Sequence, residues 1–126
     1  MATVESYKKS RRVREVSVTL TYADTTSSEM FKLPRGSRIV EWLVKVSTAF
    51  SGGTTTLDIG LSSDGDYFVD GVSLATAGYV ALGTAAVVPA YETTDITPIY
   101  MNVGAGNSAG EVEVTCKFSQ VVDRRF

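Results

Sequence analysis

Between residues 38 and 61, apolar and polar side chains alternate with a period of two, and this pattern limits the possible folds most strongly. Successive side chains of an extended strand point to opposite faces, so a period of two is typical of a strand with one buried face. In residues 38–50, the expected buried side chains are Val40, Trp42, Val44, Val46 and Phe50. The sequence therefore predicts an extended segment that carries the only tryptophan of the chain into a core.

The same alternation continues after a glycine pair, with Leu57, Ile59 and Leu61 on the apolar side. Gly52 and Gly53 lie between the two alternating halves, and glycine adopts the positive φ of a tight loop without steric cost. Two alternating runs joined by such a loop are a common signal for a β-hairpin. We therefore expect the two halves to pair with each other.

Alternating runs elsewhere in the chain indicate further short strands. A first strand is expected at about residues 14–23, another at 30–33 before Pro34, and a final hairpin from residues 96–103 and 112–118. No helix longer than about two turns is indicated. Seven or eight strands at a spacing of roughly 8–12 residues are typical of a sandwich, a jelly roll or a small barrel.

The length and composition fit one soluble domain. A chain of 126 residues is ordinary for a single domain, and 44% hydrophobic and 21% charged residues are ordinary for a soluble protein. We expect a single β-sandwich domain over residues 1–126, with a flexible basic N-terminal arm at residues 1–12 and a C-terminal tail at residues 119–126. No apolar run approaches the ~20 residues that cross a bilayer, and no signal peptide is visible, so no membrane partner is expected.

The absence of histidine removes several classes of chemistry. Histidine is the commonest general base and the commonest metal ligand, and neither a Ser-His nor a Cys-His pair can form without it. Cys116 is the only cysteine, so no intrachain disulfide is possible, which fits a reducing cytosol. It alternates in phase with apolar neighbours and is expected to be a small buried residue. We therefore expect a protein that is not an enzyme and that holds no cofactor or metal.

Two further motifs share features with ligand sites but fit turns better. Asp64, Asp66 and Asp70 could hold a calcium ion through carboxylate oxygens, but the EF-hand spacing fails and Asp-Gly pairs are common turn sequences. The glycine-rich residues 104–110 are followed by β-type alternation, whereas a dinucleotide motif must open a helix. We expect a turn and a loop at these places.

Basic residues are concentrated at the two ends of the chain. Residues 1–14 contain five basic side chains and one glutamate, a net charge of +4, and because the whole chain has a net charge of −2, the remainder carries −6. This arm could contact nucleic-acid phosphates, reach an acidic neighbouring subunit or remain a solvated tail. The body is acidic and no aromatic residues are interleaved with the basic ones, so a protein partner is favoured over a nucleic acid. The candidate partner-binding residues are Lys8, Lys9, Arg11, Arg12, Arg14, Arg124, Arg125 and Phe126.

Three segments together resemble a known group of proteins. They read IVEWLVKVSTAFSGGTTTLDIGL at residues 39–61, SSDGDYF at 62–68 and ITPIYMNVGAGNSAGEVEVTCKF at 96–118. This combination resembles the small β-rich virion proteins of tailed bacteriophages. In that family a strand ending in Ala-Phe and a glycine loop precede an Asp-containing turn, and two strands around a small-residue loop close the chain.

The resemblance implies an all-β, single-domain, jelly-roll-like sandwich that serves as a capsid decoration or cement protein. Such a protein lies on the capsid surface, binds the major capsid protein or other virion proteins, stabilises the assembled head and is made in the host cytoplasm. Parts of this kind usually form closed homo-oligomers, here a dimer or a trimer. The alternative is a tail, neck or head-fibre component involved in attachment or glycan binding. For that alternative, Tyr67, Tyr79 and Tyr91 are candidates to stack on sugar rings, although burial at the rim of the sandwich is their commoner role.

Overall fold

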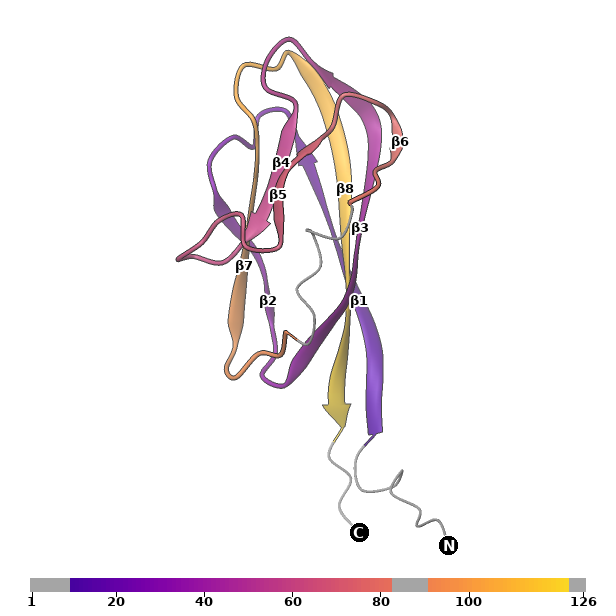
Figure 1. Cartoon of the computed structure of the whole chain (residues 1–126), viewed down its shortest axis with the longest axis vertical. Helices are drawn as coiled ribbons and strands as arrows, with labels where there is room; N and C mark the ends of the chain where they lie inside the picture. The colour runs from indigo at the N-terminus through magenta and orange to yellow at the C-terminus, as the bar shows by residue number, and fades with distance from the viewer. Residues whose placement is uncertain (1–9, 83–90, 123–126) are drawn as a thin grey trace, which may run out of the picture.

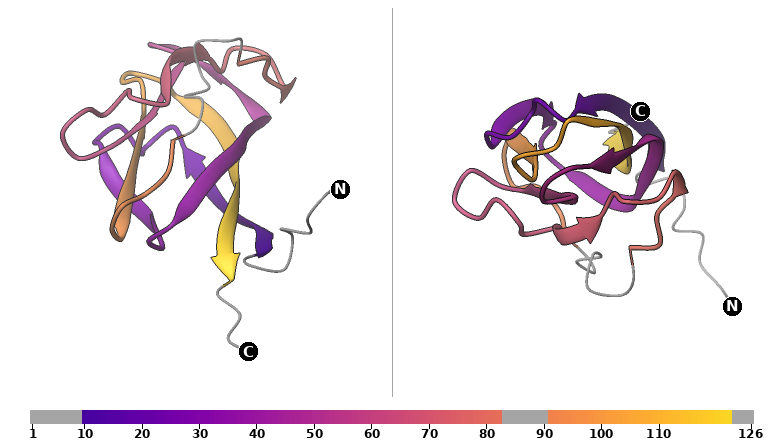
Figure 2. Two further views of the ribbon diagram at one scale, coloured as in Figure 1. Left: turned by 60° about the horizontal axis from the view of Figure 1, so that its bottom comes forward. Right: turned by 90° about the horizontal axis from the view of Figure 1, so that it is seen from above.

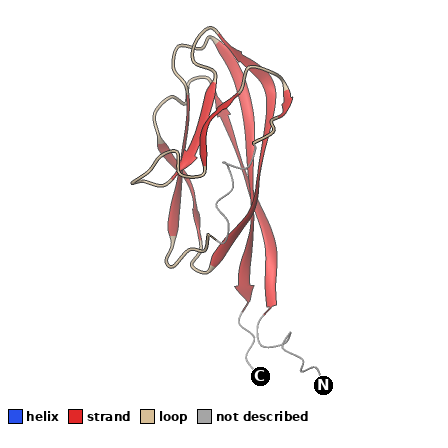
Figure 3. Cartoon of the chain, viewed as in Figure 1, coloured by secondary structure: helices blue, strands red, loops and turns tan. Residues whose placement is uncertain are grey.

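The computed structural model describes residues 10–82 and 91–122, and in these ranges it contains eight strands and no helix (Figure 3). The strands form two four-stranded sheets that face each other (Figure 1). The first sheet contains, in this order, β1 (Ser10–Thr21), β8 (Ala109–Val122), β3 (Ser37–Ser51) and β6 (Gly78–Tyr79). The second sheet contains, in this order, β2 (Ser28–Leu33), β7 (Thr97–Val103), β4 (Thr56–Gly60) and β5 (Val69–Ser73).

The strand pairs are nested within one another. β1 pairs with β8, β2 with β7, β3 with β6 and β4 with β5, and each of these pairs is antiparallel. Two further pairings, β3 with β8 and β4 with β7, join them into the two sheets. Nested antiparallel pairs divided between two facing sheets are the arrangement of a jelly roll. The expectation of an all-β, jelly-roll-like sandwich with seven or eight strands is therefore confirmed.

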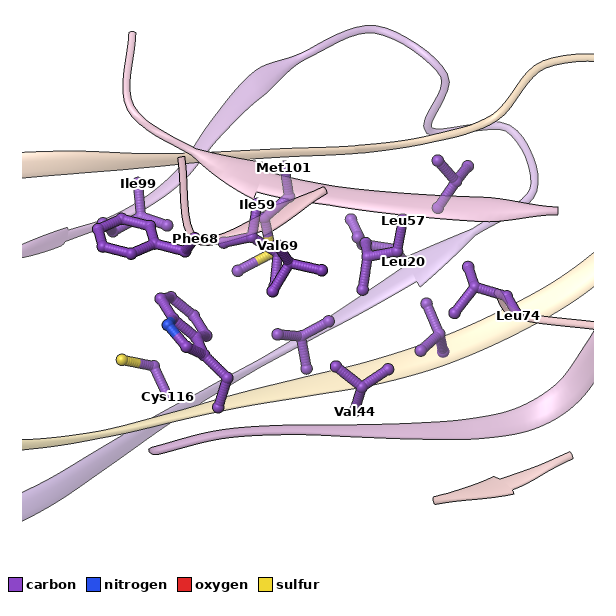
Figure 4. Close-up of a cluster of buried hydrophobic side chains, with 14 of the residues drawn as sticks. Leu20, Val44, Leu57, Ile59, Phe68, Val69, Leu74, Ile99, Met101 and Cys116 are labelled. Carbon is purple, nitrogen blue, oxygen red and sulfur yellow. The ribbon is translucent and has the colours of Figure 1, made fainter. Parts of the chain in front are cut away.

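One hydrophobic cluster fills the space between the sheets. Figure 4 shows Leu57, Ile59 and Met101 of the second sheet pointing toward Val44 and Cys116 of the first. Burying this apolar surface is the main favourable contribution to folding. The buried apolar residues of the cluster are Leu20, Leu33, Trp42, Val44, Val46, Phe50, Leu57, Ile59, Phe68, Val69, Leu74, Ile99, Met101, Val103, Val112, Val114, Cys116 and Phe118.

The tryptophan and the cysteine both occupy the core, as predicted. Trp42 is only 4% exposed, and the centroid of its ring system lies 5.5 Å from that of Phe68 and 6.5 Å from that of Phe31. Cys116 is fully buried, and burial raises the pKa of its thiol to about 12. The thiol therefore stays protonated at neutral pH and is not a nucleophile.

Both predicted hairpins are wrong. β3 and β4 lie in different sheets, and so do β7 and β8, so each connecting loop carries the chain from one sheet to the other. A period of two identifies the buried face of a strand, but it contains no information on which strand lies beside it. The actual partners are distant in sequence, because β3 pairs with β8 and β6, and β7 pairs with β2 and β4.

The two crossing loops are hydrogen-bonded to each other at one end of the sandwich, at the top of Figure 1. The Thr54 amide donates to the Ala105 carbonyl oxygen, and the Gly104 amide donates to the Thr56 carbonyl oxygen, both at 2.9 Å. The side-chain amide of Asn107 donates to the Thr54 carbonyl oxygen at 2.7 Å. A Cβ atom at Gly104 would lie 2.1 Å from the Thr54 carbonyl oxygen, so glycine is what permits this close approach.

A bulge in β3 changes the face that Val40 occupies. The register of β3 against β8 shifts between Ile39 and Glu41, and Ile39 rather than Val40 packs against the core. Val40 is 52% exposed. The expectation that Val40 is buried is therefore wrong, because an extra residue in one strand interrupts the period of two.

The strands reach further toward both chain ends than predicted. β1 begins at Ser10, so residues 10–12 belong to a strand and not to the expected arm at residues 1–12. β8 continues to Val122, so residues 119–122 are strand and not tail. In Figure 1 these parts of β1 and β8 project beyond β2 and β7. β2 and β7 end before these residues in this view, so the alternation of a strand packed against a second sheet is not expected there.

Candidate functional site

In the part of the chain that the structure describes, there is no pocket and no group of three or more side chains that could hold a metal ion. Asp64 and Asp66 interact through a side-chain hydrogen bond, which raises the pKa of Asp64. The Leu61 amide donates to the Asp64 carbonyl oxygen at 2.8 Å, so this segment is a hydrogen-bonded turn, as its Asp-Gly pair predicts. Residues 104–110 lead into β8 and not into a helix, which fits a loop and not a dinucleotide motif.

The three tyrosines considered for sugar stacking lie in different surroundings. Tyr67 and Tyr91 pack edge-to-face against Phe68, with ring centroids 5.0 and 5.1 Å from that of Phe68. This packing covers part of both rings, and burial raises the pKa of Tyr91. Tyr79 is 73% exposed, and Nζ of Lys45 lies 5.6 Å from its ring centroid. Of the three, Tyr79 alone presents most of its ring to solvent.

Three of the predicted partner-binding residues, Arg11, Arg12 and Arg14, lie on β1 where it pairs with the end of β8. The remaining five, Lys8, Lys9, Arg124, Arg125 and Phe126, lie outside the described residues, and their role stays a prediction. We call residues 10–14 and 118–122 together the basic end, because they contain three arginines and no acidic residue. Figures 1 and 2 both show these strand ends extending beyond the rest of the sandwich.

Arg12 and Arg14 are exposed on the basic end. The Arg14 guanidinium donates to Oε1 of Gln120 at 3.3 Å, which holds the Arg14 side chain against β8. Arg38 on β3, on the other side of β8, is neutralised by Glu92, with Nε of Arg38 2.6 Å from Oε1 of Glu92. Within the described ranges, neither Arg12 nor Arg14 has such an ion pair. Among the described residues, the basic end therefore has two exposed positive charges without an acidic partner.

No protein-family model and no curated protein matches the sequence. The fold has counterparts in bacteriophage capsid structures. One is a chain of the cyanophage Pam1 capsid asymmetric unit, with a TM-score of 0.62, 16% identity and coverage of 95% of this chain and 91% of that chain. Another is a chain of the acidic stable capsid structure of Helicobacter pylori bacteriophage KHP30, with a TM-score of 0.65, 14% identity and coverage of 94% of this chain and 99% of that chain.

The similarity extends over nearly the whole length of each matched chain, so those chains are about as long as this one. At identities of 14% and 16%, the comparison shows a shared fold. Both counterparts come from phage capsids, which agrees with the resemblance to phage virion proteins found in the sequence.

The sequence indicated the arginines of the candidate site but not the residues that surround them in the fold. Gln120, which binds Arg14, is 106 residues away in the chain, and nothing in the local sequence of either residue connects them. Val13 is 64% exposed on the same strand although it is apolar. The signal in the sequence is the lack of alternation up to residue 12, which predicts an arm at residues 1–12 and not the start of a strand.

Proposed function

We propose that the chain is a structural protein of a tailed-phage virion, acting as a decoration or cement protein that binds and stabilises the assembled head. The observation that carries the proposal is the fold match along nearly the full length of chains from two phage capsid structures. The match covers 95% and 94% of this chain and 91% and 99% of the matched chains, so it extends over nearly the full length of both partners in each comparison. The resemblance of the sequence to phage virion proteins supports the same conclusion independently.

The outer face of the first sheet is suited to binding another protein surface. On the outer face of the first sheet, Glu15, Lys117 and Glu41 form a row across β1, β8 and β3, with Nζ of Lys117 3.8 Å from Oε2 of Glu41. In the adjacent row, the hydroxyls of Ser17 and Thr115 share a hydrogen bond of 2.9 Å. Such a broad polar face offers many small contacts to another protein surface, whereas small-molecule sites are concave and largely apolar.

In this proposal the partners are the major capsid protein or other virion proteins, and the chain lies on the capsid surface after synthesis in the host cytoplasm. A closed homo-oligomer, a dimer or a trimer, fits this role because it repeats one contact at symmetry-related positions of a shell. Among the described residues there is no helix capable of spanning a membrane.

Phage particles assembled without the chain are expected to lose infectivity in a heat challenge at least about tenfold faster than complete particles. A tenfold faster rate corresponds to an activation free energy of inactivation that is lower by about 1.4 kcal/mol. The reason is that the cross-links between shell subunits are missing, and adding the purified chain back should restore the resistance. Unchanged heat resistance, together with a few copies confined to the tail, would rule out a decoration role.

A tail, neck or head-fibre component that binds host glycans is the second candidate, and the exposed ring of Tyr79 is the observation that favours it. The Tyr79→Ala variant separates the two functions in the same particles. A decoration protein carrying this substitution should leave adsorption to host cells unchanged and restore heat resistance fully. A glycan-binding component should instead lose adsorption with no change in heat resistance.

A further inference from the structure

We propose that the free edge of β1 is a docking site for an extended acidic segment of a partner protein, which adds to the first sheet as a further strand. Among the described residues, β1 is the outermost strand of its sheet and pairs only with β8. The pairing runs through twelve residue pairs without a register shift, and the strand contains no proline. A long, regular edge strand of this kind is a template for pairing with another chain unless something covers it.

The backbone groups that face the open edge can be assigned from two hydrogen bonds. The Tyr22 amide donates to the Gly110 carbonyl oxygen at 3.1 Å, which places the backbone of even-numbered residues toward β8. The Thr21 amide instead donates to Oδ2 of Asp24 at 2.8 Å, on the other side of the strand. The regular register extends this alternation along β1. The residues whose N–H and C=O groups face outward are therefore Arg11, Val13, Glu15, Ser17 and Thr19.

The charge of the basic end indicates the chemistry of the incoming strand. Arg12 and Arg14 are exposed without an ion pair among the described residues, and no acidic residue lies in the basic end. Gln120 already holds the Arg14 guanidinium in place, so less side-chain entropy is lost when a carboxylate binds it. An acidic strand laid along β1 would place carboxylates beside both guanidinium groups, and charge complementarity of this type sets partner choice and register.

A second copy of β1 does not supply this chemistry. In a two-fold antiparallel pairing of β1 with itself, residues that lie opposite each other share a face of the sheet. Glu15 is the only acidic residue of β1, and as an odd-numbered residue it lies on the face opposite to Arg12 and Arg14. Self-pairing therefore never places a carboxylate opposite either arginine. A nucleic acid offers phosphates to the arginines, but it cannot complete the ladder of outward N–H and C=O groups.

This inference deepens the proposed function and rests on it for the identity of the partner, because a shell protein with an extended acidic segment would supply the strand. The site itself is testable in solution on the full chain. The probe is a synthetic peptide of about eight residues, the length of a typical strand, that alternates glutamate and threonine. The matched control is the same peptide with lysine in place of glutamate.

Amide hydrogen exchange measured by NMR should first show fast exchange at Val13, Glu15, Ser17 and Thr19 and slow exchange at Arg14, Val16, Val18 and Leu20 in the chain alone. Saturating glutamate peptide should then slow the odd-numbered group by at least about tenfold and leave the even-numbered group unchanged, whereas the lysine peptide should change neither. Slow exchange of the odd-numbered amides in the chain alone would overturn the proposal. If that slow exchange became faster on dilution of the protein, a second copy of the chain would be what covers the edge.

Two variants and one control variant make the result specific to the edge. Arg12→Glu combined with Arg14→Glu should weaken glutamate-peptide binding at least about tenfold, whereas Lys45→Glu on β3 should not. Val13→Pro removes an outward N–H without removing a bond to β8, so this variant should fold normally and bind the glutamate peptide more weakly.

The proposal is overturned if the glutamate peptide has no effect at millimolar concentration. It is also overturned if duplex DNA binds in place of the peptide and its binding depends on Arg12 and Arg14. Heat resistance of the particles tests the decoration role separately, so the two proposals can fail independently.

Discussion

The Trp42→Ala variant is expected to lose about 3–5 kcal/mol of free energy of unfolding, a large part of the stability of a chain of this size. Trp42 is 4% exposed and packs against Phe68 and Phe31 between the two sheets, so its removal takes away both aromatic contacts and leaves a cavity. The loss should be measured by urea unfolding followed by far-ultraviolet circular dichroism, because the variant has no tryptophan fluorescence.

Val40→Ala is the matched control, because Val40 lies on the same strand and shares the apolar side of the sequence pattern. The bulge in β3 turns Val40 outward to 52% exposure, so its truncation should cost less than about 0.5 kcal/mol. A cost of about 2 kcal/mol or more at Val40 would mean that β3 has no bulge at this point and that the assigned register is incorrect.

Gly104→Ala is expected to cost at least about 3 kcal/mol, although it adds one methyl group in a loop. The added Cβ atom would lie 2.1 Å from the carbonyl oxygen and 2.8 Å from Cβ of Thr54, so the two crossing loops would have to separate. Their mutual hydrogen bonds, including the one from Asn107 to Thr54, would lengthen or break. The midpoint of urea unfolding measures the effect.

Gly71→Ala separates this contact from the general effect of replacing a glycine. Gly71 has a φ of +70°, and a Cβ atom there would meet no atom within 4 Å. Its substitution should therefore cost only about 1–2 kcal/mol, the penalty of a left-handed backbone conformation. If Gly71→Ala is as costly as Gly104→Ala, the close packing of the two crossing loops is not what Gly104 provides.

The sequence was a reliable guide to the strands but not to their neighbours. Alternation around Trp42 and Cys116 predicted extended segments with one buried face, and both side chains lie in the core. The same alternation continues across Gly52 and Gly53 whether the next strand pairs with β3 or crosses to the other sheet. Only contacts with segments far along the chain, such as those between the two crossing loops, decide between these alternatives.

The candidate site was predicted in part. The excess of arginine at Arg11, Arg12 and Arg14 is visible in the sequence, and the preference for a protein partner over a nucleic acid stays a prediction. Whether a strand lies at an edge depends on the order of strands in the sheet, which no local pattern contains. The outward backbone groups of β1 therefore became visible only when its pairing with β8 was known.

The proposed role as a decoration protein is tested most directly by a cryo-electron microscopy map of the phage particle that contains this chain. The account predicts density for two facing four-stranded sheets at many symmetry-related positions on the outer surface of the head, in contact with shell subunits. Density for this fold only in the tail or neck, or none on the outside of the head, would contradict it.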